Sequence, residues 1–260
     1  MHASVPPFVY VDRMPRPAQI FAYSGPDYEP GKPTAYALLK HALSLAWPSG
    51  RLRLCYVPTA VGDSQRHVDH YNSVFMVQPE VDFSVLKLFP QPSFADVRGH
   101  LLAQDVIFVE GGSVLNLMAV WRAHGLRDIL RECWESGVVL TGGSAGSICW
   151  HQGGTTDSFS DDLNPFTDGL GLLPYSNGVH DDLQDQPRRE TYRRMIADGT
   201  LDSGYASEDG VGLHYVGTKM VEAITIRDGK KAWYVAPDGC GGATASAIEP
   251  RRISSNVVVC

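Results

Sequence analysis

The sequence has few cysteines, and they form no recognisable motif. The five cysteines are an odd number among 260 residues, are widely spaced and lack a C-x-x-C pair: Cys55, Cys133, Cys149, Cys240 and Cys260. This pattern argues against a disulfide framework and against a structural zinc site. We therefore expect reduced thiols, as in cytoplasmic proteins, and no metal site.

Positive charge and long apolar runs are also scarce. The chain has 22 lysines and arginines against 29 aspartates and glutamates, a net charge of −7, which argues against nucleic acid as a partner. No run approaches the length of a membrane span, and prolines and charges interrupt the N-terminal segment where a signal peptide would be apolar. We expect a cytoplasmic protein with neither nucleic acid nor membrane as a partner.

The remaining composition is that of a globular protein, with 43% hydrophobic and 20% charged residues. A chain of 260 residues can bury most of an ordinary core. We predict one α/β domain over residues 1–260, in which the proline-rich residues 1–18 are irregular.

Short apolar runs alternate with segments of helical periodicity through the first 150 residues. Strands are predicted over residues 19–24, 51–57, 81–89 and 106–109, and helices over 34–46, 64–76, 93–102 with Ser93 as the cap, 115–123 and 126–136. Fully apolar strands between helices are typical of a parallel sheet that is buried on both faces. The fold class predicted is a doubly wound, mostly parallel α/β sheet with helices on both faces.

The pattern changes after Trp150. Residues 151–171 are polar and rich in glycine and are predicted to be loop, and a helix is predicted over 188–197. From Tyr205 onward, the segments VGLHYV, MVEAITI and KAWYV alternate between turns. They predict a C-terminal region of antiparallel hairpins.

The most informative stretch is VVLTGGSAGSICW, residues 138–150, in which an apolar run meets a glycine-rich turn. Gly142 and Gly146 flank Ser144 in the G-x-S-x-G spacing of a nucleophile elbow, where small neighbours relieve crowding at a sharp strand-to-helix turn. The helix start behind the serine favours developing negative charge. A second glycine turn, residues 110–113, follows the strand predicted over 106–109, so the two turns should meet at the carboxyl edge of the sheet.

A nucleophilic serine requires a histidine within hydrogen-bond reach. Among nine histidines, His180 lies in the polar, glycine-bearing segment 176–182, where exposed side chains are expected. His214, on an alternating strand, is expected to be packed. His180 is therefore the predicted base.

Five segments now resemble a known family: FVEGGSVLNLM, GGSAGSICW, TTDSF, DGLGLLPYSNGVH and YASEDGVGL, in that order. The chain is similar to the dipeptidase E and cyanophycinase-like serine peptidases, close in fold to class I glutamine amidotransferases. The resemblance implies that Ser144 is the nucleophile, His180 the general base, and the backbone N–H groups of Gly112 and Ala145 the oxyanion hole. The first turn of the family reads three glycines and asparagine, whereas here it reads Glu-Gly-Gly-Ser and ends at Ser113.

The resemblance also implies a third catalytic residue, an aspartate after a Thr-Thr pair. Asp157 fits that position. Several acidic residues remain as alternatives: Asp161, Asp162, Asp181 and Asp182, with Glu208 either lining the site or orienting His180.

Dipeptidase E binds an acidic side chain through an arginine that follows the catalytic histidine. Arg189 aligns best with that arginine, and its planar guanidinium suits a carboxylate. Neighbouring aspartates, among them Asp181 and Asp185, could compete for it. The substrate-binding residues expected are Arg189, Glu208 and Ser113.

The sequence thus predicts a serine peptidase that cleaves short peptides, such as aspartyl dipeptides or related isopeptides, through an acyl-enzyme. The reaction requires no metal or organic cofactor, the partner is a small peptide, and a homodimer is left open. A non-catalytic amidotransferase-like binding domain is the alternative that the altered first turn motivates. An α/β-hydrolase esterase is disfavoured, because Ser144 and His180 are only 36 positions apart and 80 residues follow His180.

Overall fold

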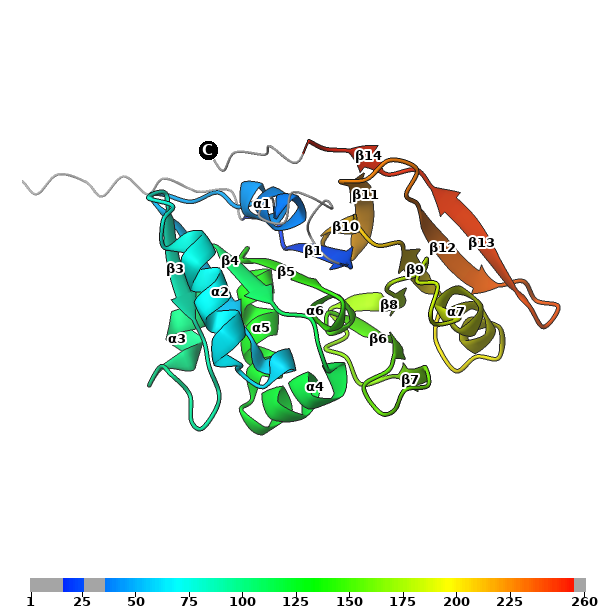
Figure 1. Ribbon diagram of the computed structural model, residues 1–260, viewed down its shortest axis with the longest axis horizontal. Coiled ribbons are helices and arrows are strands. Elements are labelled where there is room, and N and C mark those ends of the chain that lie inside the picture. Colours follow the sequence, from blue (N-terminus) through cyan, green and yellow to red (C-terminus); the bar gives the residue numbers. More distant parts are fainter. Residues whose placement is uncertain (1–15, 26–35, 255–260) are drawn as a thin grey trace, which may run out of the picture.

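The structure is a computed structural model that describes residues 16–25 and 36–254. Most of the N-terminal segment predicted to be irregular, residues 1–15, lies outside the described residues, as do the first two residues of the helix predicted over 34–46. The described chain forms two β-sheets with helices packed against them (Figure 1).

In the described part of the chain, the larger sheet has eight strands in the order β14-β11-β10-β1-β5-β4-β2-β3. The run from β1 to β3 in this order is parallel throughout, whereas β10 is antiparallel to both β1 and β11. The strands of this sheet are β1 (Gln19–Ser24), β2 (Leu52–Val57), β3 (Val81–Val85), β4 (Val106–Val109), β5 (Val139–Gly143), β10 (Val211–Val216), β11 (Lys219–Thr225) and β14 (Arg251–Arg252).

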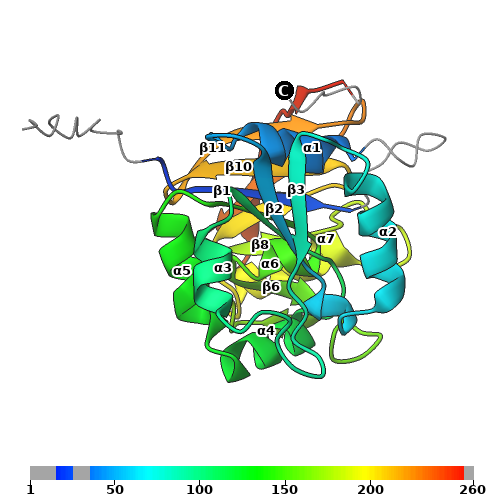
Figure 2. The same ribbon diagram turned by 90° about the vertical axis from the view of Figure 1, so that its left-hand side faces the viewer.

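Helices cover both faces of the parallel part, as Figure 2 shows with α2 on one flank and α3 and α5 on the other. The helices are α1 (Ala37–Ser44), α2 (Gln65–Phe75), α3 (Val97–Leu102), α4 (Val114–Ala123) and α5 (Leu126–Glu135). Alternate side chains of β1 serve the two faces: Phe21 packs in the cluster with α1 and α2, and Ile20 in the cluster with α3, α4 and α5. The predicted doubly wound fold is confirmed, since the chain moves outward along one face and returns along the other.

A second sheet of six strands within the described residues has the order β13-β12-β9-β8-β6-β7. Its elements are β6 (His151–Thr156), β7 (Asn164–Phe166), β8 (Leu173–Gly178), β9 (Gly204–Ser207), β12 (Ala232–Pro237), β13 (Ala243–Ile248) and the helix α7 (Arg188–Ala197). The β12–β13 hairpin extends away from the parallel sheet (Figure 1). The predicted C-terminal hairpins are confirmed, as is the helix over 188–197.

The prediction of loop over residues 151–171 was wrong, because it contains β6 and β7. The β6 strand is polar and contains two adjacent glycines, which allow close packing: a Cβ at Gly154 would lie 2.0 Å from the carbonyl oxygen of Asn177 on β8. The strand thus lacks the apolar alternation that identifies most strands.

Two boundaries differ from prediction by four residues. The strand expected over 81–89 ends at Val85, and the helix expected from Ser93 begins at Val97. Asp96 caps that helix by accepting the N–H of Gly99 at 2.8 Å, whereas the Ser93 hydroxyl donates to the carbonyl of Val85 at 3.1 Å. Ser93 therefore joins the end of β3 to the loop instead of starting a helix.

Within the described residues, none of the helices has both the length and the apolar character needed to cross a membrane. The four cysteines described are free thiols, of which Cys55, Cys133 and Cys149 are buried.

Candidate active site

Ser144 lies on the sharp turn between β5 and α6 (Ala145–Ile148). Its backbone has φ 54° and ψ −115°, a conformation that few residues other than glycine adopt. A Cβ at Gly142 would lie 2.5 Å from the carbonyl oxygen of Gly146, and one at Gly146 would lie 2.3 Å from that of Val109. The two glycines therefore form the turn that the G-x-S-x-G spacing predicted.

His180 follows β8 and is brought against Ser144 from the second sheet. Its Nε2 lies 2.9 Å from the Ser144 Oγ. The backbone of His180 also has a positive φ of 58°, and its N–H donates to the Ser24 Oγ at 2.5 Å. The predicted serine and histidine are thus adjacent, and the end of β1 fixes the histidine.

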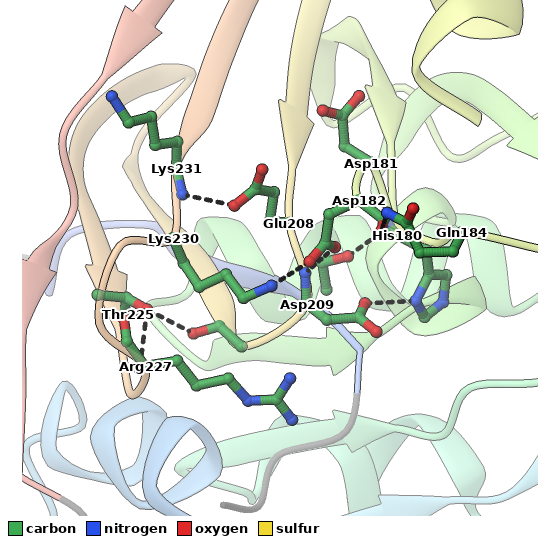
Figure 3. A network of polar contacts seen from close by, with 12 residues as sticks. His180, Asp181, Asp182, Gln184, Glu208, Asp209, Thr225, Arg227, Lys230 and Lys231 are labelled. Carbon is green, nitrogen blue, oxygen red and sulfur yellow. Dashed lines mark hydrogen bonds and ion pairs between the residues drawn. The ribbon is translucent and has the colours of Figure 1, made fainter. Parts of the chain in front are cut away.

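Asp209 is the carboxylate that contacts the histidine. It lies on the turn between β9 and β10, and its Oδ1 accepts a hydrogen bond from His180 Nδ1 at 2.6 Å (Figure 3). Burial tends to raise the pKa of Asp209, but its hydrogen bond and ion pair with His180, with the charges of Arg227 and Lys230, hold that pKa below its ordinary value. Gly25 leaves room for this carboxylate, since a Cβ there would lie 2.2 Å from Asp209 Oδ1.

The prediction that Asp157 orients His180 was wrong. Both ring nitrogens of His180 are already engaged, by Ser144 and Asp209. Asp157 instead pairs with Arg188 at 2.7 Å, and the Arg188 side chain is only 6% exposed. Asp157 therefore neutralises a buried cation. Its place in a polar segment of the sequence gave no indication of that role.

The other acidic alternatives also lie elsewhere. Asp161 and Asp162 are exposed between β6 and β7. Asp181 pairs with Arg189, and burial raises the Asp181 pKa against the effect of that arginine. Asp182 accepts the backbone N–H of Asp209 at 2.8 Å and pairs with Lys230, so it supports the carboxylate at His180 without touching the ring (Figure 3).

Glu208 and Arg189 form an ion pair with each other. Glu208 Oε1 lies 2.9 Å from Arg189, and Glu208 Oε2 accepts the backbone N–H of Lys231 at 3.1 Å. Arg189 also contacts Asp181 at 2.7 Å and lies 4.5 Å above the ring of Trp233. Two carboxylates of the chain itself therefore occupy the guanidinium that was expected to bind substrate.

The segment that follows His180, from Asp181 to the start of α7, borders a cavity of about 490 Å³. Its lining includes Gln186, Arg188, Arg189, Glu190 and Glu208. Glu208 thus lines a cavity, as one of the two roles considered for it required, but it does not orient His180.

The second glycine turn lies directly against the serine. A Cβ at Gly111 would lie 3.3 Å from the Ser144 Cβ, and one at Gly112, whose φ is 135°, would lie 2.5 Å from the carbonyl oxygen of Ala60. Among the described residues, neither the Gly112 N–H nor the Ala145 N–H has a hydrogen-bond acceptor. Ser113 caps α4 by accepting the N–H of Asn116 at 3.2 Å.

The described residues contain no group of three or more histidine, cysteine or acidic side chains arranged to hold a metal ion. Histidines away from the site serve the fold. His151 is fully buried between Ser147 and Tyr215, and burial lowers its pKa to about 4. His214 is buried and contacts Gln19, as its place on an alternating strand predicted.

Comparison with known proteins identifies the family. The sequence profile of Peptidase family S51 matches residues 29–223, most of the chain. The chain belongs to peptidase family S51. It is therefore a serine peptidase, and the resemblance to the dipeptidase E family is confirmed.

One relative of this S51 peptidase is the "Uncharacterized peptidase YgaJ" of Bacillus subtilis (strain 168). It is 40% identical over 185 residues, which cover 70% of this chain and 77% of that protein. The match supports a peptidase and does not name a substrate.

Two solved structures resemble the S51 peptidase in fold. A peptidase from an acI-B1 Actinobacterium has a TM-score of 0.67 at 14% identity, covering 91% of this chain and 96% of that one. A putative peptidase E protein from Listeria monocytogenes EGD-e has a TM-score of 0.57 at 16% identity, covering 81% and 100%. These likenesses support the class I glutamine amidotransferase-like fold.

Proposed function

We propose that the chain hydrolyses short peptides through an acyl-enzyme on Ser144. The observation that carries the proposal is the continuous line of hydrogen bonds from Ser144 through His180 to Asp209, at 2.9 and 2.6 Å. A serine, an imidazole and a carboxylate in this order are the arrangement that activates a hydroxyl at neutral pH.

In the first half of the reaction, His180 Nε2 takes the proton of the Ser144 hydroxyl while Oγ attacks the scissile carbonyl carbon. Asp209 accepts the Nδ1–H, holds the tautomer that leaves Nε2 free, and stabilises the imidazolium. The free N–H groups of Gly112 and Ala145 would bind the oxyanion of the tetrahedral intermediate, each worth about 3 kcal/mol.

In the second half, His180 returns its proton to the leaving amine, and the peptide bond breaks to leave the acyl group on Ser144. The same imidazole then takes a proton from the water that attacks the ester, and returns it to Ser144 Oγ as the ester bond breaks and the acid leaves. The strained backbone at Ser144 holds Oγ out of the sheet through both steps.

The substrates proposed are aspartyl dipeptides or related isopeptides. The pairing of Arg189 with Asp181 and Glu208 argues against a strong preference for an acidic side chain at that arginine. Substrate contacts by Arg189, Glu208 and Ser113 stay predictions, as does the cytoplasmic location. The homodimer also stays a prediction, and light scattering of the purified protein would test it.

A panel of dipeptides incubated with wild type and Ser144→Ala tests the proposal. We expect amino-acid release by wild type and a loss of about 10⁴-fold or more in kcat/KM in the variant. Ser44→Ala, on the exposed end of α1, is the matched control and should retain wild-type activity. Equal cleavage by wild type and Ser144→Ala would show that another group is the nucleophile.

A further inference from the structure

The basic face of α2 lines a second cavity, which the mechanism above does not use. Arg66 and His67 are adjacent on this helix and lie about one turn before His70, and the three are the described residues that line a cavity of about 520 Å³. Three potentially cationic side chains on one wall make this a place for an anionic group.

This basic face is connected to the nucleophile by direct contacts. The segment that leads into α2 contacts the second glycine turn, residues 110–113, which carries the Gly112 N–H proposed for the oxyanion hole and is called the oxyanion turn. The Ser113 N–H donates to the carbonyl of Ala60 at 2.9 Å. On the other side, His67 Nδ1 lies 3.7 Å from Glu110 Oε2, and the next residue, Gly111, packs against Ser144. The cavity therefore adjoins the turn that faces the scissile bond.

The arginines near the active site differ in whether the chain already pairs them with a carboxylate. Arg188 is paired with Asp157, and Arg189 with Asp181 and Glu208. Arg66, by contrast, makes no ion pair with any residue that the structure describes.

Glu110 offsets the charge of His67 and makes no ion pair with Arg66, because its Oε2 lies 3.7 Å from His67 Nδ1. Tyr56 donates its hydroxyl proton to Glu110 Oε2 at 2.5 Å, and His67 lies beside the same oxygen. His70 Nε2 is itself hydrogen-bonded to the Tyr36 hydroxyl, so Arg66 is the cation on this wall of the cavity that has no carboxylate partner among the described residues.

We propose that this face of α2 is a carboxylate subsite, which binds the free C-terminal carboxylate of the peptide on the leaving-group side of the scissile bond. The inference rests on the proposed function. A planar guanidinium binds both oxygens of a carboxylate. Because each residue of an extended peptide spans only about 3.5 Å, an anchor beside the oxyanion turn selects peptides that end shortly after the cleaved bond.

The test measures equilibrium binding to Ser144→Ala, which cannot turn over its ligand through this serine. Three peptides separate the two sources of a carboxylate: aspartyl-leucine, asparaginyl-leucine without the acidic side chain, and aspartyl-leucinamide without the terminal carboxylate. We expect the first two to bind about 10- to 100-fold more tightly than the amide. Equal binding of acid and amide, or no binding of any of the three, would overturn the subsite.

A second substitution assigns the effect to α2. Adding Arg66→Gln to Ser144→Ala should remove the preference for the free carboxylate and leave binding of the amide unchanged, and Arg66→Lys should retain part of it. Arg98→Gln, an exposed arginine on α3, is the matched control and should retain all of it. If Arg66→Gln weakens the amide as much as the acid and spares asparaginyl-leucine, Arg66 binds the aspartyl side chain and the proposal fails.

Failure of the proposed function would look different. If Ser144 is not the nucleophile, the dipeptide panel shows it, while binding to Ser144→Ala still decides the subsite. If hydrolysis depends on Ser144 and the acid binds no better than the amide, only the carboxylate subsite is refuted.

Discussion

The serine and the base in the Ser144–His180–Asp209 chain of hydrogen bonds are held in place by different interactions. Ser144 is fixed by backbone packing, with Gly142 and Gly146 at distances that exclude any side chain. His180 and Asp209 are fixed by hydrogen bonds and charge, from the Ser24 hydroxyl on one side and Asp182 with Lys230 on the other. The serine turn should therefore respond to substitution through steric strain, and the base side through graded electrostatic effects.

The largest effect should separate the two aspartates considered for the third catalytic position. Asp209→Asn should reduce kcat/KM by about 10⁴-fold, because the amide holds the wrong histidine tautomer. Asp157→Asn removes an equal charge but should change kcat/KM by less than about fivefold, although loss of the partner of buried Arg188 should lower the free energy of unfolding. A comparable loss of kcat/KM in both variants would contradict the assignment of Asp209.

Substitutions at the serine turn should destabilise the fold through steric strain. Gly146→Ala places a Cβ 2.3 Å from a carbonyl oxygen of β4, and we expect a loss of about 3 kcal/mol in the free energy of unfolding, measured with urea. Gly50→Ala, where an added Cβ meets nothing within 4 Å, is the control. Equal stability of the two variants would mean that the turn can relax and is not held by packing.

The smallest effect should come from the charges behind Asp209. Lys230→Gln removes one of the cations that lower the Asp209 pKa, and should cost up to about fivefold in kcat/KM. Asp209 orients His180 while its carboxylate is ionised, and this ionised form is lost as the pH falls through the folded-state pKa of Asp209. Removal of the Lys230 cation raises that pKa. The acid limb of the activity profile should therefore move to higher pH in Lys230→Gln.

The neighbouring Lys231→Gln is the control for this prediction. Lys231 pairs with exposed Glu249, away from His180, so its loss should leave the pH profile unchanged. Identical profiles of Lys230→Gln and Lys231→Gln would show that the charge behind Asp209 has no part in its ionisation.

The same contrast explains which parts of the site could be predicted from sequence. Packing at the serine turn leaves a local signal, since G-x-S-x-G lies within five residues between an apolar strand and a helix. The base side is assembled from β1, β8 and the turn after β9, and no spacing in the sequence records that Asp209 lies against His180. The segment YASEDGVGL did indicate the right turn, but in the structure Glu208 contacts Arg189 and Asp209 contacts the ring.

The fold shows the same division. The parallel strands could be predicted because they are apolar on both faces, and β1 and β4 were predicted with the correct bounds. The antiparallel β10 was also predicted with the correct bounds, from its alternation. The second sheet was missed in part because β6 and β8 bury polar groups. Thr155 and Asn177 are fully buried, and the latter bonds the Ser147 hydroxyl at 2.8 Å, so polarity there does not indicate exposure.

The central claim is that Ser144 is activated by His180 and Asp209. Labelling with a fluorophosphonate, followed by peptide mass spectrometry, tests it without knowledge of the substrate. We predict one equivalent of label on Ser144 in wild type and in Asp157→Asn, slow labelling in Asp209→Asn, and none in His180→Ala. Labelling of His180→Ala or Asp209→Asn at the wild-type rate, or of wild type at another residue, would contradict the account.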